Sequence, residues 1–199
     1  TDISRFDFAI QISKIASYEK RFHNKYNYPI IGVPKKVKVR KIPDPAFILS
    51  IIRQESEFDT SAHSSAGAKG LMQLMTYTAR IVAKQAKIPY SKNKLTKNPE
   101  YNINLGSFYI AGLLLEYEGS YPFAIAAYNA GPKRVKLWNK INKNPQKGKI
   151  DYVDWIELIK FNETRNYVQR VLENYNVYRY ILSQKPILIK NFFKNDPLY

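Results

Sequence analysis

The 199-residue sequence contains no cysteine, and it has only two histidines, His23 and His63. The absence of cysteine excludes disulfides and thiolate metal sites, and two histidines are too few for a histidine-rich zinc site. No apolar run is as long as a membrane-spanning helix, and the first ten residues lack the pattern of a signal peptide. We therefore expect neither a metal site nor an integral membrane segment.

Acidic residues are scarce, with 16 against 32 lysines and arginines, so the formal net charge is +16. This charge favours an anionic partner, such as nucleic acid, lipid headgroups or an acidic cell-wall polymer. The basic residues are scattered except for a cluster over residues 35–41, where we expect a solvated face, and no nucleic-acid-binding signature accompanies them. A lysine-rich, soluble surface explains the same charge, so composition leaves the partner open.

A predicted buried helix, opened by Asp44 as N-cap and Pro45, places one acid on its apolar face. Glu55 follows Ile48 by seven residues and Ile52 by three, which is the spacing of one helical face. Partial desolvation there raises the pKa of a carboxyl group, and a carboxyl protonated near neutral pH can act as a general acid. A structural glutamate at the helix end, paired with a neighbouring cation, explains the same position.

The next stretch, residues 64–70, is rich in glycine and serine and predicts a turn. A second apolar helix is expected to begin at Gly70 or Leu71. Met72 and Met75 are the only methionines of the chain, and they could line a sugar-binding groove or belong to the core. Gln73 between them is harder to explain as core, because a buried amide needs hydrogen-bonding partners.

Further helices follow from apolar periodicity and from cap residues. An N-terminal helix is expected over about residues 4–21, a short strand near 37–39 and a polar loop over 139–149. Tyr128 and Asn129 lie where one short helix ends at Gly131-Pro132 and the next begins. Glu163 lies in the first turn of the longest helix, where the helix dipole alone explains a carboxylate.

Four motifs occur in the order found in one enzyme family. They are Glu55-Ser56, GLMQLM at 70–75, AYNAG at 127–131 and ETR at 163–165. With these motifs in this order, the chain from about residue 43 to about residue 186 resembles the catalytic domain of the soluble lytic murein transglycosylases. One departure is Thr76, at a position where that family commonly has proline.

The resemblance implies a mainly α, lysozyme-like (goose-type-lysozyme-like) domain with a substrate groove and little or no β structure. It implies residues 1–42 as an N-terminal helix and basic connector, which would be either the end of an upstream helical region or a local extension. Residues 43–186 would form the catalytic domain and 187–199 a C-terminal tail.

The resemblance also implies a reaction, cleavage of the β-1,4 bond between N-acetylmuramic acid and N-acetylglucosamine in peptidoglycan. Glu55 would be general acid and then base, leaving a 1,6-anhydro end, with no cofactor and no metal. The implied partner is the peptidoglycan glycan strand, not nucleic acid, and the implied setting is a monomer in the periplasm or cell envelope. The implied substrate-binding residues are Ser56, Ser64, Met72, Gln73, Met75, Tyr128, Asn129 and Glu163.

Three alternatives stay open at the level of sequence. A muramidase that hydrolyses the same bond would need a second acid, for which only Glu57 and Asp59 lie nearby. A wall-binding module could keep the groove without catalysis. A nucleic-acid binder would use the positive charge and bind in a salt-sensitive manner.

Overall fold

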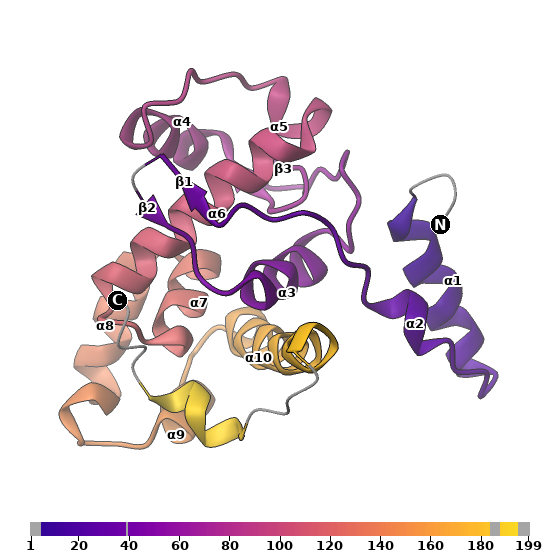
Figure 1. The fold of residues 1–199 in the computed structure, drawn as a ribbon. Coiled ribbons are helices and arrows are strands. Elements are labelled where there is room, and N and C mark those ends of the chain that lie inside the picture. The colour runs from indigo at the N-terminus through magenta and orange to yellow at the C-terminus, as the bar shows by residue number, and fades with distance from the viewer. Residues whose placement is uncertain (1–4, 39, 184–187, 195–199) are drawn as a thin grey trace. The chain divides into compact units, whose positions relative to one another are not determined.

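Helices carry nearly all of the regular structure in the computed structural model, which describes residues 5–38, 40–183 and 188–194 (Figure 1). The predicted mainly helical fold with little β structure is confirmed. The chain divides into two units, residues 1–109 and 110–199. The predicted domain boundaries stay predictions, and the one at 186/187 lies outside the described residues.

The described part of the first unit consists of helices and two short β-hairpins. The N-terminal helices α1 and α2 pack together, and β1 pairs antiparallel with β2. The elements are α1 (Phe6–Tyr18), α2 (Asn24–Asn27), β1 (Lys36–Val37), β2 (Arg40–Lys41), α3 (Pro45–Glu55), β3 (Ala68–Lys69), β4 (Leu74–Met75), α4 (Thr76–Gln85), α5 (Lys94–Lys97) and the first part of α6 (Pro99–Glu116).

Side chains cap two helix starts in this unit, and the cap at Asp44 is the predicted one. A side-chain oxygen of Asp44 accepts a hydrogen bond from the Ala46 N–H at 2.9 Å, and Asn98 does the same for the Tyr101 N–H at 2.9 Å. Each cap satisfies a backbone donor that has no partner within its helix. Local sequence therefore fixes where α3 and α6 begin.

The helix expected to open at Gly70 or Leu71 begins instead at Thr76. The residues before it form a hairpin, in which Ala68 pairs with Met75 and Lys69 with Leu74. Gly70 and Gln73 have φ values of +72° and +43°, which an α-helix does not allow. The expectation was wrong because the spacing of apolar residues carries no information on backbone conformation, and this short stretch contains two residues with left-handed φ values.

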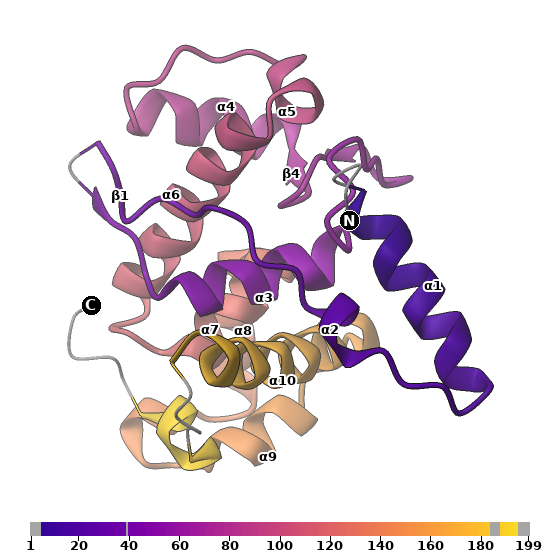
Figure 2. The same ribbon diagram turned by 45° about the vertical axis from the view of Figure 1, so that its right-hand side comes forward.

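The second unit is built from helices around an aromatic core. Its elements are the end of α6, then α7 (Tyr121–Ala130), α8 (Pro132–Ile141), η1 (Pro145–Lys147), α9 (Tyr152–Glu157), α10 (Asn162–Ser183) and η2 (Ile189–Phe193). Helix α7 packs against both α8 and α10 (Figure 2). The rings of Phe123 and Trp155 meet edge-on at a centroid distance of 4.7 Å, and both side chains are fully buried. This core anchors the first turn of α7, the helix whose last turn carries two of the predicted site residues.

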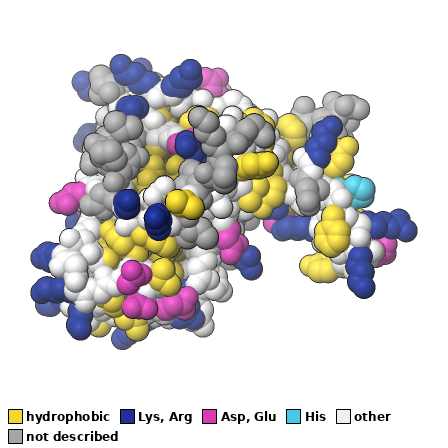
Figure 3. Space-filling view, turned by 60° about the horizontal axis from the view of Figure 1, so that its bottom comes forward, with side chains coloured by type: hydrophobic (Ala, Val, Ile, Leu, Met, Phe, Trp, Pro, Cys, Tyr) yellow, Lys and Arg dark blue, Asp and Glu magenta, His cyan; other side chains and the backbone are white. Residues whose placement is uncertain are grey.

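The positive charge is spread over the surface. Figure 3 shows lysine and arginine side chains scattered over one face, not gathered into one patch. Within the basic cluster of the β1–β2 hairpin, Arg40 is half-buried, because its Nη1 donates to the Phe108 carbonyl at 2.9 Å and its guanidinium lies over the Phe108 ring. The expectation of a wholly solvated basic face is therefore corrected at Arg40.

Candidate active site

Glu55 is the last residue of α3, a helix whose residues 46–52 are all buried. The helix cannot continue beyond it, since Glu57 and Phe58 have φ values of +50° and +68°. Phe58 is itself buried and meets the ring of Phe6 at a centroid distance of 6.3 Å, which holds the turn in place. The half-buried Glu55 therefore lies at the end of a rigid, core-anchored helix.

Ser56 connects α3 to the β3–β4 hairpin. Its hydroxyl donates to the Leu71 carbonyl at 2.8 Å, and the Ile52 carbonyl lies 3.3 Å from the same oxygen. The geometry gives Ser56 a role in positioning the residue beside it, Glu55. Its predicted contact with substrate stays a prediction.

The loop of the β3–β4 hairpin, residues 70–73, presents Gln73 in a constrained way. The Gln73 side-chain nitrogen donates to the Gly70 carbonyl at 2.8 Å and to the Ala62 carbonyl at 3.1 Å. Both amide hydrogens are therefore used within the protein, and the described part of the chain offers no partner to the side-chain oxygen. A ligand at Gln73 would meet an acceptor, Oε1.

The two methionines of this hairpin have different surroundings. Met72 is 0% exposed, and a Cβ added to Gly106 would lie 2.4 Å from its sulfur. Met75, on β4, is 44% exposed. The expectation that Met72 contacts substrate is corrected, because a side chain this deep in the core has no surface to offer, whereas Met75 keeps that possibility.

Ser64 lies in the exposed turn before β3. Its hydroxyl accepts from the Ala68 N–H at 3.0 Å, and its own N–H donates to the Ala68 carbonyl at 3.1 Å. These two bonds leave the hydroxyl hydrogen free to donate to a sugar oxygen. Sugar binding by Ser64 remains a prediction.

Three predicted residues lie in the second unit. Tyr128 and Asn129 are half-buried in the last turn of α7, and Glu163 is exposed in the first turn of α10. The buried Thr164 donates its hydroxyl to Asn129 Oδ1 at 2.6 Å, which brings these two helix ends together. Asn129, beside Tyr128, is therefore linked directly to the residue that follows Glu163.

Asn102, a fully buried residue of α6, was not among the predicted site residues. Its Oδ1 accepts from the Met72 N–H at 2.8 Å, and its Nδ2 donates to the carbonyls of Lys69 and Leu95, each at 2.9 Å. The available signal was a polar residue one turn before Gly106 on the same helical face. A buried amide with a small residue beside it indicates the close approach of another backbone.

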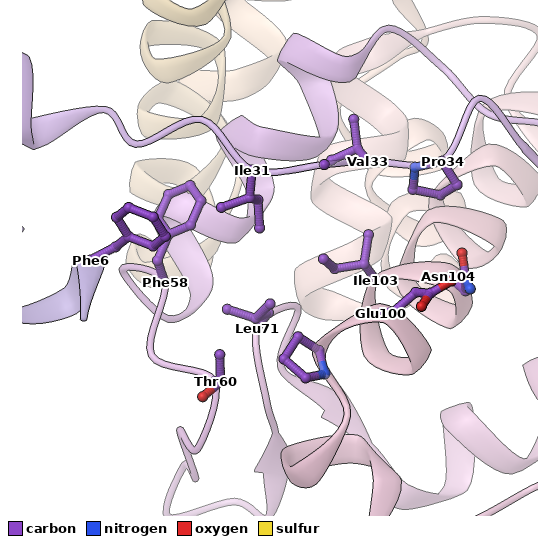
Figure 4. Close-up of a pocket in the computed structure, with 12 residues that line it drawn as sticks. Phe6, Ile31, Val33, Pro34, Phe58, Thr60, Leu71, Glu100, Ile103 and Asn104 are labelled. Atoms are coloured by element: carbon purple, nitrogen blue, oxygen red, sulfur yellow. The ribbon is translucent and has the colours of Figure 1, made fainter. Parts of the chain in front are cut away.

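A separate hollow of the first unit contains none of the predicted residues. It has a volume of about 560 Å³ and is lined by apolar side chains, among them Phe58, Leu71 and Ile103, with Glu100 and Asn104 at one side (Figure 4). Because the hollow lacks Glu55 and the polar groups of the hairpin, it does not serve as the candidate active site.

The described ranges contain neither a cluster of metal ligands nor a membrane-spanning helix. Residues 5–38, 40–183 and 188–194 contain no group of three or more histidine, cysteine, aspartate or glutamate side chains that could hold a metal ion. Within the same ranges no helix has the length and apolarity to cross a membrane.

Comparison with known proteins places this geometry in a family. The model of the transglycosylase SLT domain matches residues 33–150, which is more than half of the chain. This chain belongs to the transglycosylase SLT domain family. Eight of the nine predicted site residues lie within the matched range, and Glu163 lies beyond it.

Relatives of this SLT domain are longer proteins. The soluble lytic murein transglycosylase of Escherichia coli strain K12 is 38% identical over 172 residues, which are 86% of this chain and 25% of that protein. The one from Salmonella typhimurium is 39% identical over 147 residues, 73% of this chain and 22% of the relative. The chain thus spans about a quarter of the length of these relatives.

Two solved structures share the fold of this SLT domain. The 70-kDa soluble lytic transglycosylase of Escherichia coli matches with a TM-score of 0.80 and 35% identity, over 92% of this chain and 29% of that one. The lytic transglycosylase Slt of Pseudomonas aeruginosa, solved as an inactive glutamate-to-glutamine mutant, matches with a TM-score of 0.66 and 39% identity, over 73% of this chain and 23% of that one. The predicted lysozyme-like fold is confirmed by these matches.

Proposed function

We propose that this SLT domain is a lytic transglycosylase that cleaves the β-1,4 bond between N-acetylmuramic acid and N-acetylglucosamine in peptidoglycan. The observation that carries the proposal is the position of Glu55, a half-buried carboxyl group at the end of the buried helix α3 in a chain of this family. The inactive Pseudomonas aeruginosa Slt mutant also exchanges a glutamate for glutamine, and this supports a mechanism that depends on one such acid.

Glu55 acts twice in the proposed reaction. Its carboxyl group first gives a proton to the glycosidic oxygen, so that the bond to C1 of the muramic residue breaks and the glucosamine leaves with a free hydroxyl. The N-acetyl group of the muramic residue stabilises the positive charge at C1. The ionised Glu55 then takes the proton of the C6 hydroxyl, whose oxygen bonds to C1 and closes the 1,6-anhydro ring. The acid returns to its starting form and no water is consumed.

The two acids nearest to Glu55 are engaged elsewhere, and this favours transglycosylation over hydrolysis. Glu57 forms ion pairs with Lys14 and Arg53, the latter at 3.3 Å. Asp59 Oδ1 accepts from the N–H and from the hydroxyl of Ser61, at 2.8 and 2.7 Å. A hydrolase needs a second carboxylate to activate water or to form a covalent intermediate, and these contacts oppose such a role for either acid.

The remaining predicted residues have roles that suit a glycan. The exposed Met75 offers an apolar surface to a sugar ring, Gln73 Oε1 accepts from a sugar hydroxyl and Ser64 donates to one. Tyr128 holds the muramic N-acetyl group, with Asn129 beside it. Glu163 supports this end of α7 through its neighbour Thr164 and has no proton to transfer in the scheme.

The net charge of +16 suits a wall polymer whose stem peptides carry carboxylates. We therefore propose peptidoglycan glycan strands as the partner, the periplasm or cell envelope as the location, and action as a monomer without a cofactor. On the face that Figure 3 shows, the described basic residues form no continuous stripe, so this face gives no support to nucleic-acid binding.

The nature of the products tests the proposal. Purified protein is incubated with peptidoglycan sacculi in heavy-oxygen water, and the released muropeptides are weighed by mass spectrometry. We expect 1,6-anhydro-muramic ends without heavy oxygen, lighter than the labelled hydrolysis product by one heavy-oxygen water, about 20 mass units. Reducing ends that carry the label would establish a muramidase. Binding to sacculi without any release would establish a wall-binding module.

A further inference from the structure

The loop of the β3–β4 hairpin, residues 70–73, is held by side chains from outside it as well as by its own backbone. The carbonyl of Leu71 accepts from the Ser56 hydroxyl, and that of Gly70 accepts from the side chain of Gln73. Asn102 serves two further groups, the carbonyl of Lys69 before the loop and the N–H of Met72 within it. Three side chains thus form hydrogen bonds with backbone groups of four consecutive residues, Lys69 to Met72.

The side-chain amide of Asn102 joins α6 to this loop and to the residue before it. Both of its donors and one acceptor are used, and the second donor reaches the Leu95 carbonyl of α5 at 2.9 Å. The side chain is 0% exposed, so water cannot replace a lost bond. A buried amide whose donors are all satisfied fixes the relative position of the backbones that it joins.

The backbone comes close to Asn102 because of two glycines. A Cβ at Gly70 would lie 2.0 Å from the Leu95 carbonyl oxygen and 2.5 Å from Asn102 Nδ2, and a Cβ at Gly106 would meet Met72. The loop therefore packs directly against α6, and that helix sets its position.

We propose that Asn102 is a positioning residue that sets the affinity for the glycan by holding the loop that presents Gln73 and Met75. The proposal rests on the proposed function, because it takes these two side chains as sugar contacts. Asn102 itself is too deeply buried to touch a substrate.

The effect should fall on substrate binding more than on proton transfer. Glu55 is placed by the buried residues 46–52 of α3, and its link to the loop is indirect, through the bond from the neighbouring Ser56 to the Leu71 carbonyl. Gln73 has a left-handed φ of +43°, a conformation that persists only where the surroundings impose it. Loss of the Asn102 bonds releases Gln73 first, so KM should rise while kcat changes little.

The decisive variant is Asn102→Asp, which keeps the shape of the side chain. The uncharged carboxyl group still accepts from the Met72 N–H and donates to one of the two carbonyls. The ionised group instead faces the carbonyl oxygens of Lys69 and Leu95, both of which are acceptors. Function should therefore be close to wild type at low pH and be lost as the introduced carboxyl ionises, a pH dependence that a purely structural asparagine elsewhere on α6 does not give.

Asn104→Asp is the matched control, since it introduces the same charge two residues along α6, where no hydrogen bond to the described residues is present. Glycan affinity is measured at pH 5 and pH 8 in proteins that also carry Glu55→Gln. KM and kcat are measured in proteins that keep Glu55. The hydrogen-exchange rate of the Met72 amide is measured without substrate. For Asn102→Asp we expect affinity to fall by about tenfold between the two pH values, in line with the loss of one or two buried hydrogen bonds. The control should follow wild type.

The experiment distinguishes failure of the positioning role of Asn102 from failure of the proposed transglycosylase reaction. Faster Met72 exchange together with the pH-dependent loss of affinity supports the role of Asn102, even if wild type releases no muropeptides and the proposed reaction fails. A folded Asn102→Asp protein with wild-type affinity at both pH values overturns it. A loss in kcat with an unchanged KM also overturns it, because the substitution would then affect Glu55 and not substrate binding. Should Asn102→Asp not fold at pH 8, its melting temperature and glycan affinity at pH 5, compared with those of Asn104→Asp, decide in the same way.

Discussion

Replacing Gly70 by alanine should destabilise the protein for two reasons that the structure separates. Gly70 has a φ of +72°, and an added Cβ would lie 2.0 Å from the Leu95 carbonyl oxygen. The left-handed conformation costs an alanine about 1–2 kcal/mol relative to glycine. The contact with Leu95 involves backbone, which cannot swing away, and forced displacement of packed groups costs about 1–3 kcal/mol.

We therefore expect Gly70→Ala to lose about 3 kcal/mol of unfolding free energy, or about 6–12 °C in Tm for a chain of this size. Gly67→Ala is the control, because Gly67 also has a positive φ, +91°, but its added Cβ would meet nothing within 4 Å. It should lose only the conformational part, about 1 kcal/mol.

Urea unfolding followed by circular dichroism measures both variants, and unchanged m-values would show that only stability differs. The difference between the two losses is the cost of moving Leu95 and Asn102 away from the loop. If Gly70→Ala is no less stable than Gly67→Ala, the loop does not lie on α5 and α6 as described, and the positioning role of Asn102 loses its basis.

Three other predictions concern single side chains. Glu55→Gln should fold and bind glycan but lose about a thousandfold in turnover, since it has no proton to give, and near-native muropeptide release would remove Glu55 from the mechanism. Glu163→Ala should reduce turnover less than Glu55→Gln, and equal losses in two folded proteins would place Glu163 in the catalytic set. The two hydrogen bonds from Arg5 lower the pKa of Asp7, which stabilises the folded state above the ordinary aspartate pKa and is lost as pH falls. The gap in urea midpoint between wild type and Asp7→Asn should thus be wide at pH 7 and should narrow as the pH falls below the ordinary aspartate pKa.

The parts of the fold that depend on neighbouring residues could be predicted from the sequence. The start of α3 follows from Asp44 and Pro45, and the placement of Glu55 follows from the apolar spacing before it. Both signals act within one or two helical turns, where backbone donors and side-chain faces are set by sequence distance alone. The expected end of the short helix at Gly131 was right for the same reason.

The hairpin loop could not be predicted in this way, because distant residues hold it. Asn102 bonds to Met72 across 30 positions, and Ser56 bonds to Leu71 across 15. The local stretch, taken alone, has the apolar residues and the good helix formers of a helix start. Contacts made by α6 and α3 outweigh that local preference and stabilise a turn with two left-handed residues.

The two methionines turn this difference into a test. Residues three apart share one face of a helix, so a helical stretch would give Met72 and Met75 the same surroundings. In the hairpin the turn at Gln73 separates them, and Met72 is 0% exposed while Met75 is 44% exposed. Met72→Ala should therefore cost about 2–5 kcal/mol of stability with little change in KM for the remaining folded protein. Met75→Ala should stay within about 0.5 kcal/mol of wild type and raise KM, because its side chain is free to contact a sugar. Urea midpoints and muropeptide release distinguish the two, and equal effects of both substitutions on KM would mean that this loop does not hold the two side chains apart as the hairpin requires.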